Sequence, residues 1–71
     1  MVGVYAEEYL GVLNSHLKTH PGYRADMKFT AVFAQGGLVT NTRDRVQTPD
    51  DARVFDETFS RVTQEYRLIV L

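Results

Sequence analysis

The sequence predicts a small α+β fold, with an antiparallel sheet built on a central β-hairpin and two helices packed on one face. Gly36-Gly37 separates two runs with the composition of β-strands, residues 26–35 and 38–47. One segment with helical periodicity precedes the hairpin and another follows it. The 71 residues form a single domain, 1–71, because the chain is too short for a linker and a second core.

The first helix is predicted between Tyr5 and Thr19. Its apolar residues recur every three or four positions and form one stripe, which consists of Ala6, Tyr9, Leu10, Leu13 and Leu17. Acidic residues in the first turn and basic residues near the last turn complement the helix dipole. Pro21 ends the helix, because proline disfavours the α conformation of the residue before it.

The hairpin is predicted to turn at Gly36-Gly37, because tight two-residue turns need positive φ angles. This loop length predicts which side chains share a face. The face expected to cover the core carries Met27, Phe29, Ala31, Phe33, Leu38, Thr40, Thr42, Asp44 and Val46. The face expected to meet water or a partner carries Lys28, Thr30, Val32, Ala34, Val39, Asn41, Arg43 and Arg45. Reversing the charges of Arg43 and Arg45 should then leave folding nearly intact.

The second helix is predicted to begin at Thr48, whose hydroxyl can cap it, followed by Pro49 at the first helical position. Asp50 and Asp51 fill the first turn. The apolar stripe consists of Ala52, Phe55, Phe59, Val62 and Tyr66. Phe55 and Phe59 lie at the centre of this stripe and are predicted to anchor the core.

The end of the sequence, residues 67–71, continues the helical stripe but also has the apolar, β-branched character of a buried strand. We favour a strand. With Met1 to Val4 as a first short strand, the order would be βαββαβ, which resembles the split arrangement of ferredoxin-like domains in topology alone. Without that first strand the order would be αββαβ, and the sequence leaves both open.

Composition restricts the classes of function. The chain has no cysteine, and its formal net charge is −1. No apolar run approaches the roughly 20 residues that span a bilayer, and the N-terminus lacks the features of a signal peptide. We therefore expect a cytoplasmic protein without a membrane partner. No motif for a cofactor is found, so none is expected.

Two histidines are weak candidates for metal ligands. His16 and His20 are four residues apart and would share one face of a helix, but a metal site needs a third ligand. Their position at the helix end is explained by the helix dipole. No nucleophile and base are paired by the sequence, so the chain is predicted not to be an enzyme. A metal-dependent enzyme built across a dimer is the third-ranked hypothesis.

The favoured function is a non-catalytic protein-interaction module, such as a small adaptor, an inhibitor or an assembly subunit. The candidate partner-binding residues are Lys28, Asn41, Arg43, Arg45, Tyr5 and Tyr23, because basic side chains and tyrosines can recognise a protein surface. The alternative is a nucleic-acid-binding domain that uses the basic hairpin face. That face has no aromatic residue to stack on a base, so nucleic acid is not favoured.

Self-association as a homodimer is also predicted. The candidate interface is the terminal apolar segment, Leu68, Ile69, Val70 and Leu71. An apolar strand with a free edge tends to pair with another chain, and two-fold pairing would bury that edge. The competing explanation is that this strand closes the sheet of its own protomer.

Overall fold

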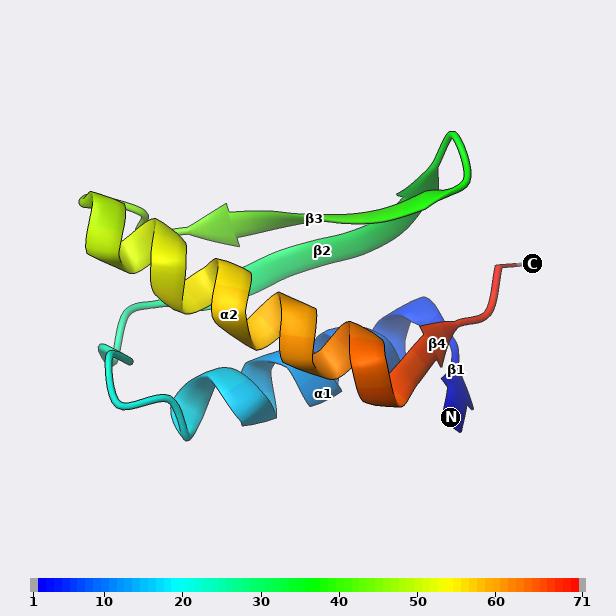
Figure 1. Cartoon of the computed structure of the whole chain (residues 1–71), viewed down its shortest axis with the longest axis horizontal. Helices are drawn as coiled ribbons and strands as arrows, with labels where there is room; N and C mark the ends of the chain where they lie inside the picture. The colour runs from blue at the N-terminus through cyan, green and yellow to red at the C-terminus, as the bar shows by residue number, and fades with distance from the viewer. Residues whose placement is uncertain (1, 71) are drawn as a thin grey trace.

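The computed structural model describes residues 2–70 and has the element order βαββαβ (Figure 1). The elements are β1 (Val2–Val4), α1 (Ala6–Lys18), β2 (Lys28–Gln35), β3 (Leu38–Asp44), α2 (Pro49–Glu65) and β4 (Tyr66–Leu68). The predicted α+β class, both helices, the hairpin and a strand near the C-terminus are confirmed. Met1, which the sequence places in the first strand, lies outside the described residues.

The strands form two separate sheets within residues 2–70. β2 and β3 are antiparallel, whereas β1 and β4 pair in parallel, with Val4 opposite Leu68. The Ile69 N–H extends this pairing by donating to the Val4 carbonyl at 2.8 Å. The element order is that of a ferredoxin-like domain, but β1 and β4 form a separate parallel sheet at one end of the helices and do not join the hairpin (Figure 1).

The core lies between the hairpin and the two helices, which pack on one side of it (Figure 1). The rings of Phe29 and Phe55 meet edge to face at its centre, with centroids 5.0 Å apart. The other buried apolar residues are Val4, Tyr9, Leu13, Leu17, Met27, Val32, Val54 and Val62. Phe55 is therefore a core anchor as predicted, whereas Phe59 is only partly buried. The buried stripe of α2 is rotated towards Val54 and Thr58, which the sequence analysis missed.

The hairpin register explains where the predicted faces are wrong. The turn is the expected one, with Gln35 opposite Leu38 and positive φ at both glycines. A β-bulge at Thr30, however, places Phe29 opposite Arg43. One extra residue exchanges the two faces of a strand, because side chains alternate with a period of two.

Several residues of the hairpin therefore lie on the opposite face from the one predicted. Val32 is buried, while Phe33 and Leu38 are exposed, at 41% and 74%. Val46, predicted to cover the core, is also exposed. Along β3 it is Arg43, and not its neighbours on the predicted core face, that lies opposite buried Phe29.

Asp51 organises the start of α2. Thr48 caps the helix as predicted, and it forms a capping box with Asp51. The Asp51 carboxylate is buried, where it accepts the N–H groups of Gln47 at 3.0 Å and Thr48 at 3.2 Å. It also forms an ion pair with Arg24. The ion pair with Arg24 joins the loop between α1 and β2 to the start of the second helix.

Tyr9 should make folding sensitive to alkaline pH. Its side chain is buried, and this burial raises the pKa of its hydroxyl above the ordinary value of 10.0. The unfolded chain then loses the proton at lower pH than the folded protein. The contribution of protonated Tyr9 to the free energy of unfolding is therefore fully present below pH 10.0 and is lost as the pH rises above it.

We expect Tyr9→Phe to reduce this alkaline loss, measured by thermal unfolding near neutral pH and above pH 10.0. The variant also loses the hydrogen bond from the Tyr9 hydroxyl to the Tyr66 carbonyl, at 3.3 Å. The informative quantity is therefore the change with pH in each protein. An equal alkaline loss in both proteins would contradict this prediction.

Candidate interaction surfaces

An apolar groove lies at the end of the molecule that contains the hairpin turn. It has a volume of about 530 Å³ and three walls, formed by residues 32–34 of β2, residues 5–7 at the start of α1 and residues 68–70. In Figure 1 the C-terminal segment rises from β4 towards the distal half of the hairpin. Glu7 is the one charged side chain among the described residues that line it.

The groove brings together four of the predicted site residues. Tyr5 borders the same space as Leu68, Ile69 and Val70, although no sequence pattern predicted that they lie together. Tyr5 is 49% exposed and Val70 is 66% exposed. Leu71, the last predicted interface residue, lies outside the described residues. The terminal strand has one edge paired with β1, so its predicted role in a dimer stays a prediction.

The basic hairpin residues separate into two environments. Lys28, Arg45 and Tyr23 line a second hollow of about 520 Å³, together with Lys18. Asp26 and Asp44 line it too, so the hollow has only a small excess of positive charge. Arg45 is the one residue other than glycine with positive φ among the described residues, at 67°.

Asn41 and Arg43 do not belong to that exposed surface. The Arg43 guanidinium lies 5.4 Å from the centre of the Phe55 ring and pairs with Asp56 at 2.6 Å. Its Nε donates to the Asn41 side-chain oxygen at 2.8 Å, so Asn41 orients Arg43. The prediction that these two residues face a partner is not supported, because their contacts are within the domain.

Arg43 and Arg45 should therefore respond differently to the same charge reversal. Arg43→Glu removes the contact with Phe55 and places a carboxylate near Asp56, so we expect a loss of about 1–3 kcal/mol in the free energy of unfolding. Arg45→Glu changes an exposed side chain and should stay within about 0.5 kcal/mol. Urea denaturation of both variants measures the difference. Equal stability would show that Arg43 faces solvent, as the sequence analysis expected.

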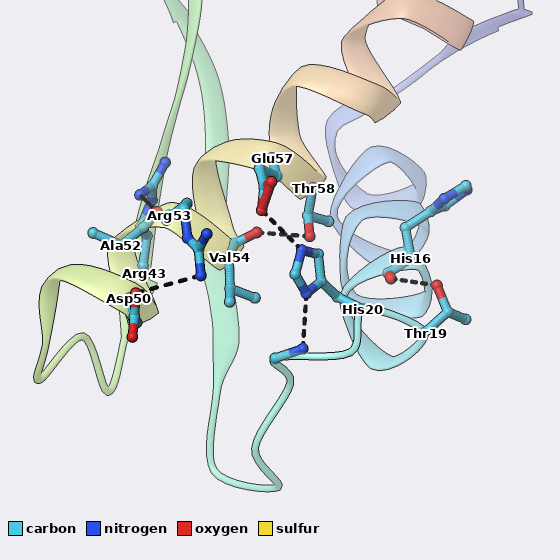
Figure 2. A network of polar contacts seen from close by, with 11 residues as sticks. His16, Thr19, His20, Arg43, Asp50, Ala52, Arg53, Val54, Glu57 and Thr58 are labelled. Atoms are coloured by element: carbon cyan, nitrogen blue, oxygen red, sulfur yellow. Dashed lines mark hydrogen bonds and ion pairs between the residues drawn. The ribbon is translucent and has the colours of Figure 1, made fainter.

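The two histidines are not arranged as a pair of metal ligands. His20 lies beyond the end of α1, where its Nε2 is 3.1 Å from a Glu57 oxygen. Its Nδ1 accepts the Gly22 N–H at 2.9 Å, which places the proton of the neutral ring on Nε2. His16 points away from His20 (Figure 2) and packs edge-on against Tyr66, with centroids 6.3 Å apart. Within residues 2–70, no group of three His, Cys, Asp or Glu side chains could hold a metal ion.

Comparison with known proteins gives no relative for this chain. No protein-family model, curated protein or solved structure matches it. Within residues 2–70, no helix has the length and apolar character needed to cross a membrane. A function is therefore inferred from the surfaces described above.

Proposed function

We propose that this chain is a non-catalytic protein-interaction module that self-associates as a homodimer through the apolar groove. The observation that carries the proposal is the gathering of exposed apolar side chains at one place. Tyr5, Phe33 and Val70 all line the groove, and each is more than 40% exposed. Contiguous apolar surface of this kind is typical of interaction sites on small proteins.

The size of the domain supports the same proposal. A chain of 71 residues without cysteines can draw on neither disulfides nor a large core for stability. Burial of the groove in a dimer would add apolar contact without any change in the protomer fold. Two-fold association is the commonest arrangement of soluble oligomers, and it would cover the same patch on both copies.

Two valine-to-lysine variants test whether the groove is the interface. Val70 lines the groove and Val46 does not, yet both are exposed, at 66% and 45%. We expect Val70→Lys to raise the dimer dissociation constant at least tenfold, because a charge would be buried in an apolar contact. Val46→Lys should leave it unchanged. Sedimentation equilibrium over a dilution series measures both.

Two results would contradict the proposal. A wild-type chain that remains monomeric throughout the dilution series would remove the homodimer. Equal dimer affinity in the two variants would place the interface outside the groove. Circular dichroism of each variant provides the control, because both substitutions are at exposed positions and should leave the fold intact.

A nucleic acid is the second candidate partner, supported by the cations around the basic hollow. Lys18, Lys28 and Arg45 form no ion pair with any described residue. Their charges would be free to contact phosphates, and binding would then weaken steeply with salt. Lys28→Glu combined with Arg45→Glu should abolish such binding. We rank it second because Asp26 and Asp44 line the same hollow.

A further inference from the structure

β2 pairs with β3 along one edge only, and its other, outer edge has free backbone groups in the half next to the turn. Gln35 and Leu38 close the two-residue turn, and in such hairpins alternate residues direct their N–H and C=O groups towards the partner strand. The backbone N–H and C=O groups of Phe33 and Gln35 therefore point towards β3, whereas those of Val32 and Ala34 point away from it. Within residues 2–70, no hydrogen bond outside the regular elements engages the backbone of Val32 or Ala34.

The other half of this edge is already protected. The Asn14 side chain donates to the Phe29 carbonyl at 3.2 Å and accepts the Phe29 N–H at 2.8 Å. It thus replaces a neighbouring strand at that position. The bulge at Thr30 follows directly, and bulges also discourage pairing at an edge. Beyond it, residues 31–35 have none of these features, and they contain neither charge nor proline.

We propose that two copies of this chain pair through the free halves of their β2 edges, antiparallel about a two-fold axis at Phe33. The two hairpins would then form one continuous four-stranded sheet in the order β3-β2-β2-β3. This inference rests on the proposed self-association and specifies its geometry. The added strand would lie in the apolar groove, with residues 68–70 beside it.

The register follows from the backbone groups that are free. When Val32 lies opposite the second copy's Ala34, all the outward N–H and C=O groups of both residues are bonded, which gives about four hydrogen bonds across the axis. Phe33 then faces its own symmetry mate in a non-hydrogen-bonded pair. Aromatic residues that face each other across strands stabilise a sheet, and this pairing would cover the exposed Phe33 ring.

A second copy fits this edge in charge. The pairing places Ala31 opposite Gln35, Val32 opposite Ala34 and Phe33 opposite itself. Each pair consists of uncharged side chains, so the edge is desolvated without burying an unpaired charge. An acidic or basic segment of another protein would instead place a charge in a groove whose one charged described residue is Glu7.

Single cysteines can test this register directly, because the natural chain has none. Non-hydrogen-bonded antiparallel pairs have Cα atoms about 4.5 Å apart, which lies within the range of roughly 4.4–6.8 Å that disulfides span. We expect Phe33→Cys to form a disulfide-linked dimer under mild oxidation. Leu38→Cys is the control, because Leu38 is more exposed but lies far from the axis.

A mixing experiment tests the register without altering Phe33. Ala31→Cys and Gln35→Cys should each stay unlinked alone and become linked when the two proteins are mixed. Faster linkage of Leu38→Cys than of Phe33→Cys, or linkage of Ala31→Cys alone, would overturn the inference. A wild-type dimer in which neither the Phe33 variant nor the mixture becomes linked would overturn it and leave the proposed function standing. A monomeric wild-type chain would overturn both.

Discussion

Replacing Phe55 with alanine is expected to lower the free energy of unfolding by about 3–5 kcal/mol, which is comparable with the whole stability of a small domain. The Phe55 side chain is fully buried. Its ring meets Phe29 edge to face and lies beneath the Arg43 guanidinium. The substitution therefore removes apolar contact, leaves a cavity and separates the hairpin from α2.

Phe59→Ala is the matched control for this experiment. Phe59 is the same residue type on the same helix, but it is only partly buried and its ring centroid lies 6.4 Å from that of Phe29. Its loss should be clearly smaller than that of Phe55. Thermal unfolding of both variants at one protein concentration gives the comparison. Equal losses would mean that the apolar stripe of α2 is centred as the sequence analysis predicted.

Replacing Asp51 with alanine is expected to cost about 2–4 kcal/mol, because the helix loses its capping box and two backbone N–H groups lose their buried acceptor. The N–H groups of Gln47 and Thr48 both donate to one Asp51 oxygen, and Arg24 pairs with the same oxygen. The change therefore acts on α2, on the segment before it and on the loop after α1.

Asp50→Ala provides the control, since Asp50 lies beside Asp51 but is highly exposed, and its one ion pair within residues 2–70 is with Arg53, at 3.3 Å. Its effect should stay within about 0.5 kcal/mol. Chemical denaturation of the two variants measures the difference. A loss of similar size in both would show that charge at the start of α2, rather than the buried network, is what matters.

Local patterns were sufficient to predict the helices and the turn. The apolar stripe of α1, the Thr48 cap and the Gly36-Gly37 turn are each determined by neighbouring residues. The structure confirms the cap, the turn and the stripe from Tyr9 to Leu17, whereas Ala6 is exposed. The role of Asp51 also had a local signal, because Thr48 and Asp51 have the spacing of a capping box. Its contact with Arg24 had none, because the two residues are far apart in the sequence.

The faces of the hairpin could not be predicted in the same way. The bulge at Thr30 has no glycine or proline to mark it. Phe29, before the bulge, reaches the core as predicted, but beyond the bulge the two faces of β2 are exchanged. Arg43 is a charged residue that packs on an aromatic ring, and polarity alone predicts the opposite orientation. The pairing of β1 with β4 joins the two ends of the described chain and likewise leaves no local trace.

The candidate site was predicted only in parts. The apolar terminal segment and Tyr5 were singled out separately, but the groove that they share with β2 depends on the tertiary fold. Lys28 and Arg45 were expected on one surface and do line one hollow, to which Tyr23 also contributes. Asn41 and Arg43 were expected there because the register was assumed to be regular. A cytoplasmic location and the identity of any other partner stay predictions.

The mass of the unmodified chain in solution tests the central proposal most directly. Light scattering at micromolar concentration should give twice the 8.1 kDa of one chain, falling towards 8.1 kDa on dilution. The dimer should also bury the apolar groove, so Val70→Lys should shift the mass towards 8.1 kDa at the same concentration. A single species of 8.1 kDa for the unmodified chain throughout the concentration series would contradict the account.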